Sequence, residues 1–556
     1  MPVRKPSHWI TAAALAGALT LTATSAVAAP TRDTSNNNTT HKITQAVSQQ
    51  KLTEHLNAFQ SIAEANDGNR ASGTSGYQAS VDYVVERLRA AGYTPEVQAF
   101  DFPFFQERTP ATVAADGTQL AAEDVAVMTY SGTGTVTGAV QAVDTTGARV
   151  GSTSGCEASD FAGFEAGNIA LLQRGTCSFA VKAANAEAAG ASAVLIFNTG
   201  LPNAEDAVAG TLGSPEATSL PVVGLSYQAG VDLLDAAEVT VATDTVSATR
   251  TTYNVLAETG SGDPENTVIV GAHLDGVLEG AGISDNGTGS AGILAIAEAM
   301  AKTKTENTVR FAWWGAEELG LLGAEHYVTD LRENDPEAFE DIAMYLNFDM
   351  IGSPNYGRFV YDGDASTFDP GDTNVPEGSA AIEAAFHEHF ASVGLASGDT
   401  EFSGRSDYGP FIEADIPSGG LFTGAEGVKT QEQAELFGGQ AGVAYDSCYH
   451  SACDDISNVN LQGMEEMSDA AAAVVLRYAT STHDVNGEGK PYRQKGKGAV
   501  GHPKGDDRGH GPHSEHGRGR ARGRDRARSA GRGRGRRPSG GRRRPCPSAG
   551  RACPRR

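Results

Sequence analysis

The chain has 556 residues, of which 40% are hydrophobic and 20% are charged. This length predicts at least two folded units. Apart from the N-terminus, no apolar run approaches the roughly 18 residues that span a bilayer. The composition therefore excludes a multi-pass membrane protein, a fully disordered chain and a fibre.

The net charge of −26 hides an asymmetry between the two parts of the chain. Residues 490–556 hold 22 basic and 4 acidic side chains, a net charge of +18, and the other 489 residues hold 21 basic and 65 acidic ones, a net charge of −44. Such an acidic body repels nucleic acid and anionic membrane surfaces. We therefore expect neither as a partner of the folded body, and only the basic tail is suited to polyanions.

The first 28 residues have the pattern of a signal peptide. A short basic start and the apolar run Ile10–Leu21 precede the small-residue site Ala26-Val27-Ala28. The pattern predicts a secreted, extracellular protein in which disulfides persist, with a retained membrane anchor as the alternative. Residues 29–45 are predicted to be a polar leader. Residues 485–556 are predicted to be a disordered Gly/Arg-rich tail, either a tether or an out-of-frame or decaying terminus.

Residues 46–117 are predicted to be the first part of an α/β domain. Apolar positions recur at helical spacing in Tyr83–Arg89, and Gly92 ends this helix. Glu96–Phe102 then alternates like an edge strand.

The sequence pattern changes between residues 118 and 247, where short Val- and Ala-rich segments, predicted to be strands, alternate with Gly and Thr turns. A strand, a helix and a buried strand follow one another here: Ile169–Gly175, Phe179–Ala186 and Ala193–Asn198. This order, with Cys156 and Cys177, resembles the protease-associated (PA) domain, a β-rich α+β insertion of many secreted peptidases. The resemblance implies a Cys156–Cys177 disulfide. An ordinary β-rich accessory domain is the alternative.

Strands and helices alternate again in residues 248–484, the predicted catalytic part. The strands are Thr267–Gly271, Val309–Trp314 and Ala343–Phe348, and helices cover Gly289–Met300 and the residues from about Leu321. This pattern predicts an α/β fold with a mostly parallel or mixed central sheet flanked by helices. Reactive groups of such sheets collect beyond the carboxyl ends of the strands.

Candidate metal ligands follow each of these three strands. They are His273, Asp275 and Asp285 after the first strand, Glu317 and Glu318 after the second, and Asp349 after the third. A further histidine, His450, stands between Cys448 and Cys453. The two cysteines are predicted to form a disulfide that rigidifies this loop, with a zinc-binding pair as the alternative.

Two histidines and several carboxylates at one sheet edge are suited to a pair of zinc ions. We assign Asp285 as the carboxylate that both ions share, which holds them about 3.5–4 Å apart. His273 and Asp349 then complete one ion, and Glu318 and His450 complete the other.

Two further carboxylates receive other roles. Asp275 comes two residues after His273 and is placed to orient its imidazole. Glu317 is expected to be the general base, which takes a proton from the shared water and returns it to the leaving amine.

These motifs, in this order, resemble peptidase family M28, especially its secreted bacterial dizinc aminopeptidases. The matching pieces are Gly271–Asp275, Ser284–Gly287, Gly315–Glu318, Asn347–Gly352 and Tyr449-His450. The likeness covers about Leu52 to His483, with the PA domain as an insertion. Five pieces in order are specific, and the family's zinc-binding, bridging and base roles carry over to the residues assigned above.

The resemblance also implies roles that spacing does not show. Tyr449 matches a tyrosine that hydrogen-bonds the oxyanion of the tetrahedral intermediate. Arg405, within Phe402–Gly409, matches a substrate-facing stretch, and a surface salt bridge is its alternative. A free α-amino group is cationic, so Glu317 and Asp349 are suited to hold it. This favours an aminopeptidase over an endopeptidase.

The remaining histidines and acids are weaker candidates. His326 is predicted to be an interior or surface residue, and His387 and His389 lie on different helix faces because they are two residues apart. Asp454 and Asp455 are candidate ligands for calcium, an ion that the family resemblance allows but that no spacing demands.

We therefore expect a monomeric, secreted enzyme that removes N-terminal residues from peptides or proteins with a free N-terminus. One rival is another hydrolase on the same fold, a carboxypeptidase or an aminoacylase. Another is a non-catalytic peptide-binding relative. Glutaminyl cyclases share the fold but use one zinc.

Overall fold

The computed structural model describes residues 36–492. The predicted signal peptide, the first part of the leader and residues 493–556 of the tail lie outside the described residues. Within the described part, no helix is long and apolar enough to cross a membrane.

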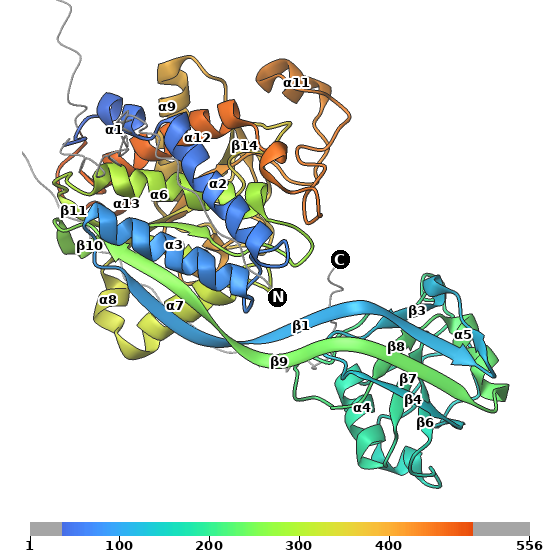
Figure 1. The fold of residues 1–556 in the computed structure, drawn as a ribbon. Coiled ribbons are helices and arrows are strands. Elements are labelled where there is room, and N and C mark those ends of the chain that lie inside the picture. The colour runs from blue at the N-terminus through green and yellow to red at the C-terminus, as the bar shows by residue number, and fades with distance from the viewer. Residues whose placement is uncertain (1–35, 493–556) are drawn as a thin grey trace, which may run out of the picture. The chain divides into compact units, whose positions relative to one another are not determined.

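A ten-stranded mixed sheet forms the larger part of the structure (Figure 1). Its order is β14-β13-β15-β12-β10-β11-β9-β1-β2, and β4 pairs with β9 off this path. The strands are β1 (Glu96–Ala115), β2 (Thr118–Gln119), β4 (Gly134–Gly138), β9 (Val239–Glu258), β10 (Asp263–His273), β11 (Asn307–Trp314), β12 (Ile342–Phe348), β13 (Phe359–Tyr361), β14 (Gly398–Thr400) and β15 (Ser418–Phe422).

The middle of this sheet is parallel, and antiparallel pairs flank it on both sides, although the edge strands β13 and β14 run parallel to each other. β10 runs parallel to β11 and β12, and β15 runs parallel to β12. The register pairs His273 with Trp314 and Gly271 with Asn347. The carboxyl ends of β10, β11 and β12 therefore meet at one edge of the sheet, as the β/α alternation predicts.

Helices cover both faces of the sheet because its buried strands alternate apolar side chains between the faces. Val270 belongs to the larger core and its neighbour Ile269 to the smaller one. The helices on the larger core are α1 (Thr40–Ala46), α2 (Gln49–Ala65), α3 (Ser75–Ala91), α6 (Thr288–Met300), α9 (Ser379–Val393), α12 (Leu461–Tyr478) and α13 (His483–Asn486). Those on the smaller core are α7 (Leu322–Asn334), α8 (Pro336–Glu340) and α10 (Tyr408–Glu413). Figure 1 shows α3 and α7 on opposite sides of the sheet.

Helix α3 is longer than its apolar pattern predicts, but it ends where expected. Thr74 caps its start by accepting a hydrogen bond from the amide of Tyr77, and Gly92 ends it with a φ of 107°. Only glycine adopts this conformation without strain. The strand after it, β1, is also longer than the predicted Glu96–Phe102.

A second, five-stranded sheet lies between β1 and β9 in the sequence, in the order β3-β8-β7-β6-β5. Its strands are β3 (Val125–Val127), β5 (Val140–Ala142), β6 (Ile169–Gln173), β7 (Ala193–Phe197) and β8 (Val222–Leu225). Helices α4 (Phe179–Ala188) and α5 (Tyr227–Asp232) accompany it. A disulfide joins Cys156 to Cys177.

Candidate active site

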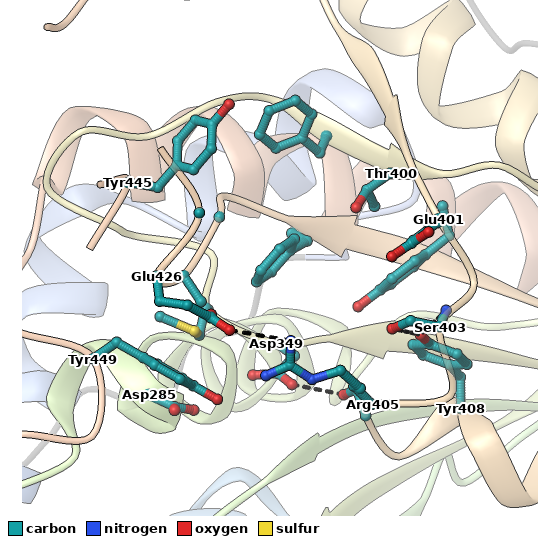
Figure 2. Close-up of a pocket in the computed structure, with 18 of the residues that line it drawn as sticks. Asp285, Asp349, Thr400, Glu401, Ser403, Arg405, Tyr408, Glu426, Tyr445 and Tyr449 are labelled. Atoms are coloured by element: carbon teal, nitrogen blue, oxygen red, sulfur yellow. Dashed lines mark hydrogen bonds and ion pairs between the residues drawn. The ribbon is translucent and has the colours of Figure 1, made fainter. Parts of the chain in front are cut away.

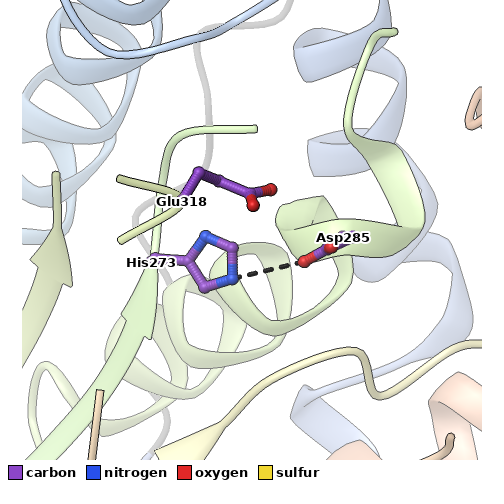
Figure 3. A group of neighbouring side chains, drawn as sticks. All are labelled: His273, Asp285 and Glu318. Atoms are coloured by element: carbon purple, nitrogen blue, oxygen red, sulfur yellow. Dashed lines mark ion pairs between the residues drawn. The ribbon is translucent and has the colours of Figure 1, made fainter. Parts of the chain in front are cut away.

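The loops after β10, β11 and β12 bring the predicted ligands to one place. His273 is the last residue of β10, and Asp285 lies in an irregular turn, η4 (Ile283–Gly287), just before α6. Figure 3 shows His273, Asp285 and Glu318 facing one another. His273 is 1% exposed and Asp285 is 5% exposed, so the centre of the site is buried.

The Asp285 carboxylate lies between two imidazoles. Its Oδ1 is 3.3 Å from Nε2 of His273, and its Oδ2 is 3.2 Å from Nε2 of His450. On one side, His273 Nε2 is 3.2 Å from Oδ1 of Asp349. On the other side, His450 Nε2 is 2.9 Å from Oε2 of Glu318. The side chains that we assigned to two ions thus form two groups that meet at Asp285.

The donor set of this site fits metal ions. Ligand atoms of His273, Asp285 and Glu318 lie within 4.8 Å of one another, as do those of His273, Glu317 and Asp349. Oε1 of Glu318 is buried and has no hydrogen-bond partner among residues 36–492. A buried carboxylate oxygen without a donor is costly unless a cation contacts it. Imidazole and carboxylate donors in this number are those that zinc accepts.

The pKa values of the side chains in this site also favour the binding of cations. Burial raises the pKa of Glu317 well above its ordinary value, against the charge of His273. Burial and the charge of Asp285 raise the pKa of Glu318 to about 8. Burial lowers the pKa of His450, but hydrogen bonds to Asp285 and Glu318 outweigh it and raise that pKa to about 10. Without cations, the site therefore retains protons that metal binding would displace.

The backbone beside the ligands adopts an unusual conformation. Ala316, Met350 and His450 have φ values of 55°, 48° and 52°. Non-glycine residues seldom adopt this left-handed region, and such residues concentrate at functional sites. Here each of them is a predicted ligand or is adjacent to Glu317 or Asp349.

Asp275 supports the site in a different way from the prediction. Nδ1 of His273 lies 3.1 Å from the backbone carbonyl oxygen of Asp275 and 3.8 Å from its carboxylate. The imidazole therefore donates to the carbonyl. The carboxylate of Asp275 instead accepts a hydrogen bond of 3.3 Å from the amide of Glu317.

Two buried residues near Asp349 escaped the sequence analysis. Ser406 donates a 2.6 Å hydrogen bond to Oδ2 of Asp349 and accepts one from the amide group of Asn347. Asp407 is 1% exposed, and neither of its oxygens has a hydrogen-bond partner in the described part of the chain. Burial above all raises its pKa well above the ordinary value. The stretch that holds both was singled out, but only for Arg405.

A cavity of about 350 Å³ opens beside the ligands (Figure 2). Its apolar wall includes Met350, Phe359 and Phe422. Arg405 also lines it, and its Nη1 is 3.2 Å from Oε1 of Glu426. Arg405 thus lines the cavity, as a substrate-facing residue would, and also forms the salt bridge that was the alternative prediction.

The loop with the second histidine is closed by a disulfide between Cys448 and Cys453. Within it, Tyr449 stacks on His450 with ring centroids 3.9 Å apart, and Tyr449 lines the cavity. Asp454 follows the loop and accepts hydrogen bonds from the amides of Ser284 and Asp285.

The weaker candidates lie elsewhere. Asp455 accepts a hydrogen bond from the amide of Ser457, and His326 stacks on Phe100. His387 pairs with Asp399 at 2.9 Å and lies near Glu383. His389 does not belong to this group of three side chains.

A mixed α/β sheet with two imidazoles around one carboxylate at its edge, one from a strand end and one from a separate loop, is suited to metal-dependent hydrolysis. The model of peptidase family M28 matches residues 254–475, and the model of the PA domain matches residues 136–233. An aminopeptidase of Pseudomonas aeruginosa is 47% identical over 445 residues, which are 79% of this chain and 82% of that protein. Leucine aminopeptidase 2 of Trichophyton tonsurans is 39% identical over 452 residues, which are 80% and 86% of the two chains. The chain belongs to peptidase family M28 and carries a PA domain.

Two solved structures share this fold. An aminopeptidase from Aneurinibacillus sp. strain AM-1 has a TM-score of 0.55 at 26% identity, covering 78% of this chain and 95% of that one. A zinc aminopeptidase from Bacillus subtilis has a TM-score of 0.51 at 24% identity, covering 78% and 97%.

Proposed function

We propose that the protein is a secreted zinc aminopeptidase that uses two metal ions to remove N-terminal residues from peptides. The central observation is the Asp285 carboxylate, which presents one oxygen to His273 and the other to His450. A carboxylate shared in this way is what a two-metal site requires. The family relationship and the relatives named aminopeptidase support the substrate class.

The residues that would hold the ions are those of the two groups that meet at Asp285. His273 and Asp349 would hold one ion, and Glu318 and His450 the other. When bound, such ions lower the pKa of a water molecule and polarise a peptide carbonyl. Calcium at Asp454 and Asp455 is not part of this proposal, because neither residue belongs to a cluster of potential metal ligands among residues 36–492.

Glu317 acts as the general base in this proposal. Its carboxylate lies 3.9 Å from Nε2 of His273, at the edge of the ligand group, and is 9% exposed. It takes the proton of the attacking water and passes it to the departing amine, so that the bond between the first two residues breaks with no net change in protons. Tyr449, on the cavity wall beside His450, donates a hydrogen bond to the oxyanion.

The substrate would enter through the cavity. Asp285, Glu317, Glu318 and Asp349 all line its inner end, where they attract a cationic α-amino group. The apolar wall suits the side chain of the first residue. Arg405, at the wall, is positioned for the peptide beyond the scissile bond.

The proposal extends to the whole chain. Residues 46–117 and 248–484 form the peptidase domain, and residues 118–247 form the inserted PA domain. The signal peptide is removed and the mature protein acts as a monomer outside the cell. The acidic body takes neither nucleic acid nor a membrane as a partner.

Metal analysis combined with a blocked substrate tests this function. Purified protein should hold two zinc ions per chain and hydrolyse leucyl anilide but not its N-acetylated form. An aminoacylase or a carboxypeptidase does not require a free α-amino group, so neither would show this preference for the unblocked anilide. A glutaminyl cyclase-like site would hold one zinc ion. A binding protein would hydrolyse neither substrate. Hydrolysis that persists after complete removal of metal would refute the proposal.

A further inference from the structure

A fully buried arginine lies beside the metal-ligand loop, outside the segment that the family model matches. Arg70 is in the connection between α2 and α3 and is 0% exposed. Burial lowers the pKa of its guanidinium to about 10, so the group still carries its charge at neutral pH. Among residues 36–492, no carboxylate forms an ion pair with it. A buried charge without an ionic partner is costly and must be satisfied by hydrogen bonds.

The guanidinium donates its hydrogen bonds to three backbone carbonyls. Nη1 donates to Leu274 at 2.5 Å, Nε donates to Ala281 at 2.9 Å, and Nη2 donates to Gly282. Leu274 directly follows the ligand His273, and Gly282 lies three residues before the ligand Asp285. One planar cation thus joins both ends of the loop that connects two metal ligands.

The loop closes tightly around this cation. A methyl group on Gly282 would lie 3.3 Å from Nη2 of Arg70 and 2.8 Å from the carbonyl oxygen of Asp285. Gly282 also has a φ of 62°, a conformation that disfavours side chains. The ring of Phe59 packs on the other side, with its centroid 4.9 Å from the guanidinium carbon.

An anion holds the same turn from a different element. Oδ1 and Oδ2 of Asp454 accept hydrogen bonds of 2.8 Å and 3.1 Å from the amides of Ser284 and Asp285. Asp454 is itself 2% exposed and follows Cys453 directly. Carbonyls of the loop therefore contact a cation and amides of the turn contact an anion, which matches the polarity of each group.

We propose that Arg70 is a positioning residue for the metal site, which fixes the separation of His273 and Asp285 through the loop between them. The inference rests on the proposed function for the identity of the metal, but the contacts of Arg70 do not depend on it. Lysine cannot replace arginine here, because its single ammonium nitrogen cannot reproduce the three separate guanidinium nitrogens that donate to the three carbonyls.

The test compares Arg70→Lys with Arg358→Lys in the full chain. Arg358 is a matched control, because it is 6% exposed and donates through Nε to a backbone carbonyl, that of Ala396, outside the ligand loop. Three readouts are taken: amide hydrogen exchange of residues 274–287 in zinc-free protein, the rate of zinc transfer to a chelator, and kcat and KM for leucyl anilide.

We expect Arg70→Lys to speed exchange in residues 274–287 and zinc release by about 10–100-fold. It should also lower kcat more than it raises KM. Arg358→Lys should lower only the melting temperature. Wild-type exchange and zinc release in Arg70→Lys would overturn the inference.

Two further outcomes keep the tests separate. If Arg70→Lys does not fold, Gly282→Ala decides, because its methyl group displaces the loop from the guanidinium and should give the same pattern. Unchanged amide exchange of residues 274–287 in that variant would refute the positioning role of Arg70. If wild-type protein binds no zinc, the proposed function fails, while the exchange comparison still tests the contacts of Arg70.

Discussion

Glu317 and Glu318 are adjacent in the chain, but the proposed function gives them different tasks. Both line the cavity, but Glu318 pairs with His450 at 2.9 Å, whereas the carboxylate of Glu317 lies 3.9 Å from Nε2 of His273. Replacing Glu317 by Gln removes the proton acceptor and preserves the shape. We expect kcat to fall about 10²–10⁴-fold while two zinc ions remain bound.

Metal analysis and steady-state kinetics on the same preparation check this prediction. Glu325→Gln, an exposed change in the first turn of α7, is the control and should leave both unchanged. A Glu317→Gln enzyme with a near-normal kcat would show that another group accepts the proton.

Protons on the ligands should make zinc binding depend on pH. The pKa of His450 rises to about 10 from its ordinary value of 6.5, and that of Glu318 rises to about 8 from 4.5. Both groups therefore hold protons at pH 7 in the metal-free site, and zinc must displace them. We expect the zinc affinity to increase from pH 6 to pH 8, by roughly tenfold per pH unit for each displaced proton.

Calorimetry of zinc binding in buffers with different ionisation enthalpies measures this proton release directly. His387→Gln, which changes a histidine outside the site, should give the same release as the wild type. Binding without proton release would contradict the prediction, because it would mean that His450 and Glu318 are already deprotonated in the metal-free site.

At the scale of the elements, the two disulfides offer a matched comparison. Cys448–Cys453 closes a short loop that presents His450, whereas Cys156–Cys177 closes a longer loop in the PA domain. Loop entropy assigns about 2 kcal/mol of stability to the first and about 3 kcal/mol to the second. Removing the first by a Cys→Ser pair should nevertheless weaken zinc binding and kcat more than removing the second.

Zinc content, kcat and the melting temperature of both double variants test this ordering. Loss of zinc from the Cys156/Cys177 variant alone would contradict it, because no ligand lies in that loop.

The helices, strands and loops also show which parts of the fold and of the site can be predicted from the sequence. Most of the predicted ligands could be found because they follow strands whose apolar runs are easily recognised, as Asp349 follows β12. His450 follows no strand, and its position between Cys448 and Cys453 and the family motif pointed to it instead. Arg70 could not be found, because its partners are carbonyls more than 200 positions away that any residue type supplies. The full length of β1 was missed because exposed polar residues follow Phe105. Asp407 was missed because burial, not sequence pattern, makes its carboxyl unusual.

At the scale of the whole molecule, the described residues form separate cores for the two parts. The two large cores around the catalytic sheet contain no residue from 118–247. The cores of the PA domain take from outside that range only residues of β1, such as Val113. β1 and β9 are antiparallel partners, and Glu107 pairs with Thr245 in their register. The PA domain is therefore inserted at a hairpin that a short turn can close.

We expect a variant that joins Glu107 to Thr245 through Asn-Gly to fold and to keep the catalytic site. Asn-Gly favours the tight turn that links two antiparallel strands, and the cut removes no part of the two catalytic cores. The variant should bind two zinc ions and hydrolyse leucyl anilide with a kcat close to that of the full chain. Differences should appear only with long peptides or proteins, if the PA domain selects them. Circular dichroism, zinc content and kinetics on both substrate lengths decide the matter, and a soluble, folded variant that has lost zinc would show that the PA domain supports the site.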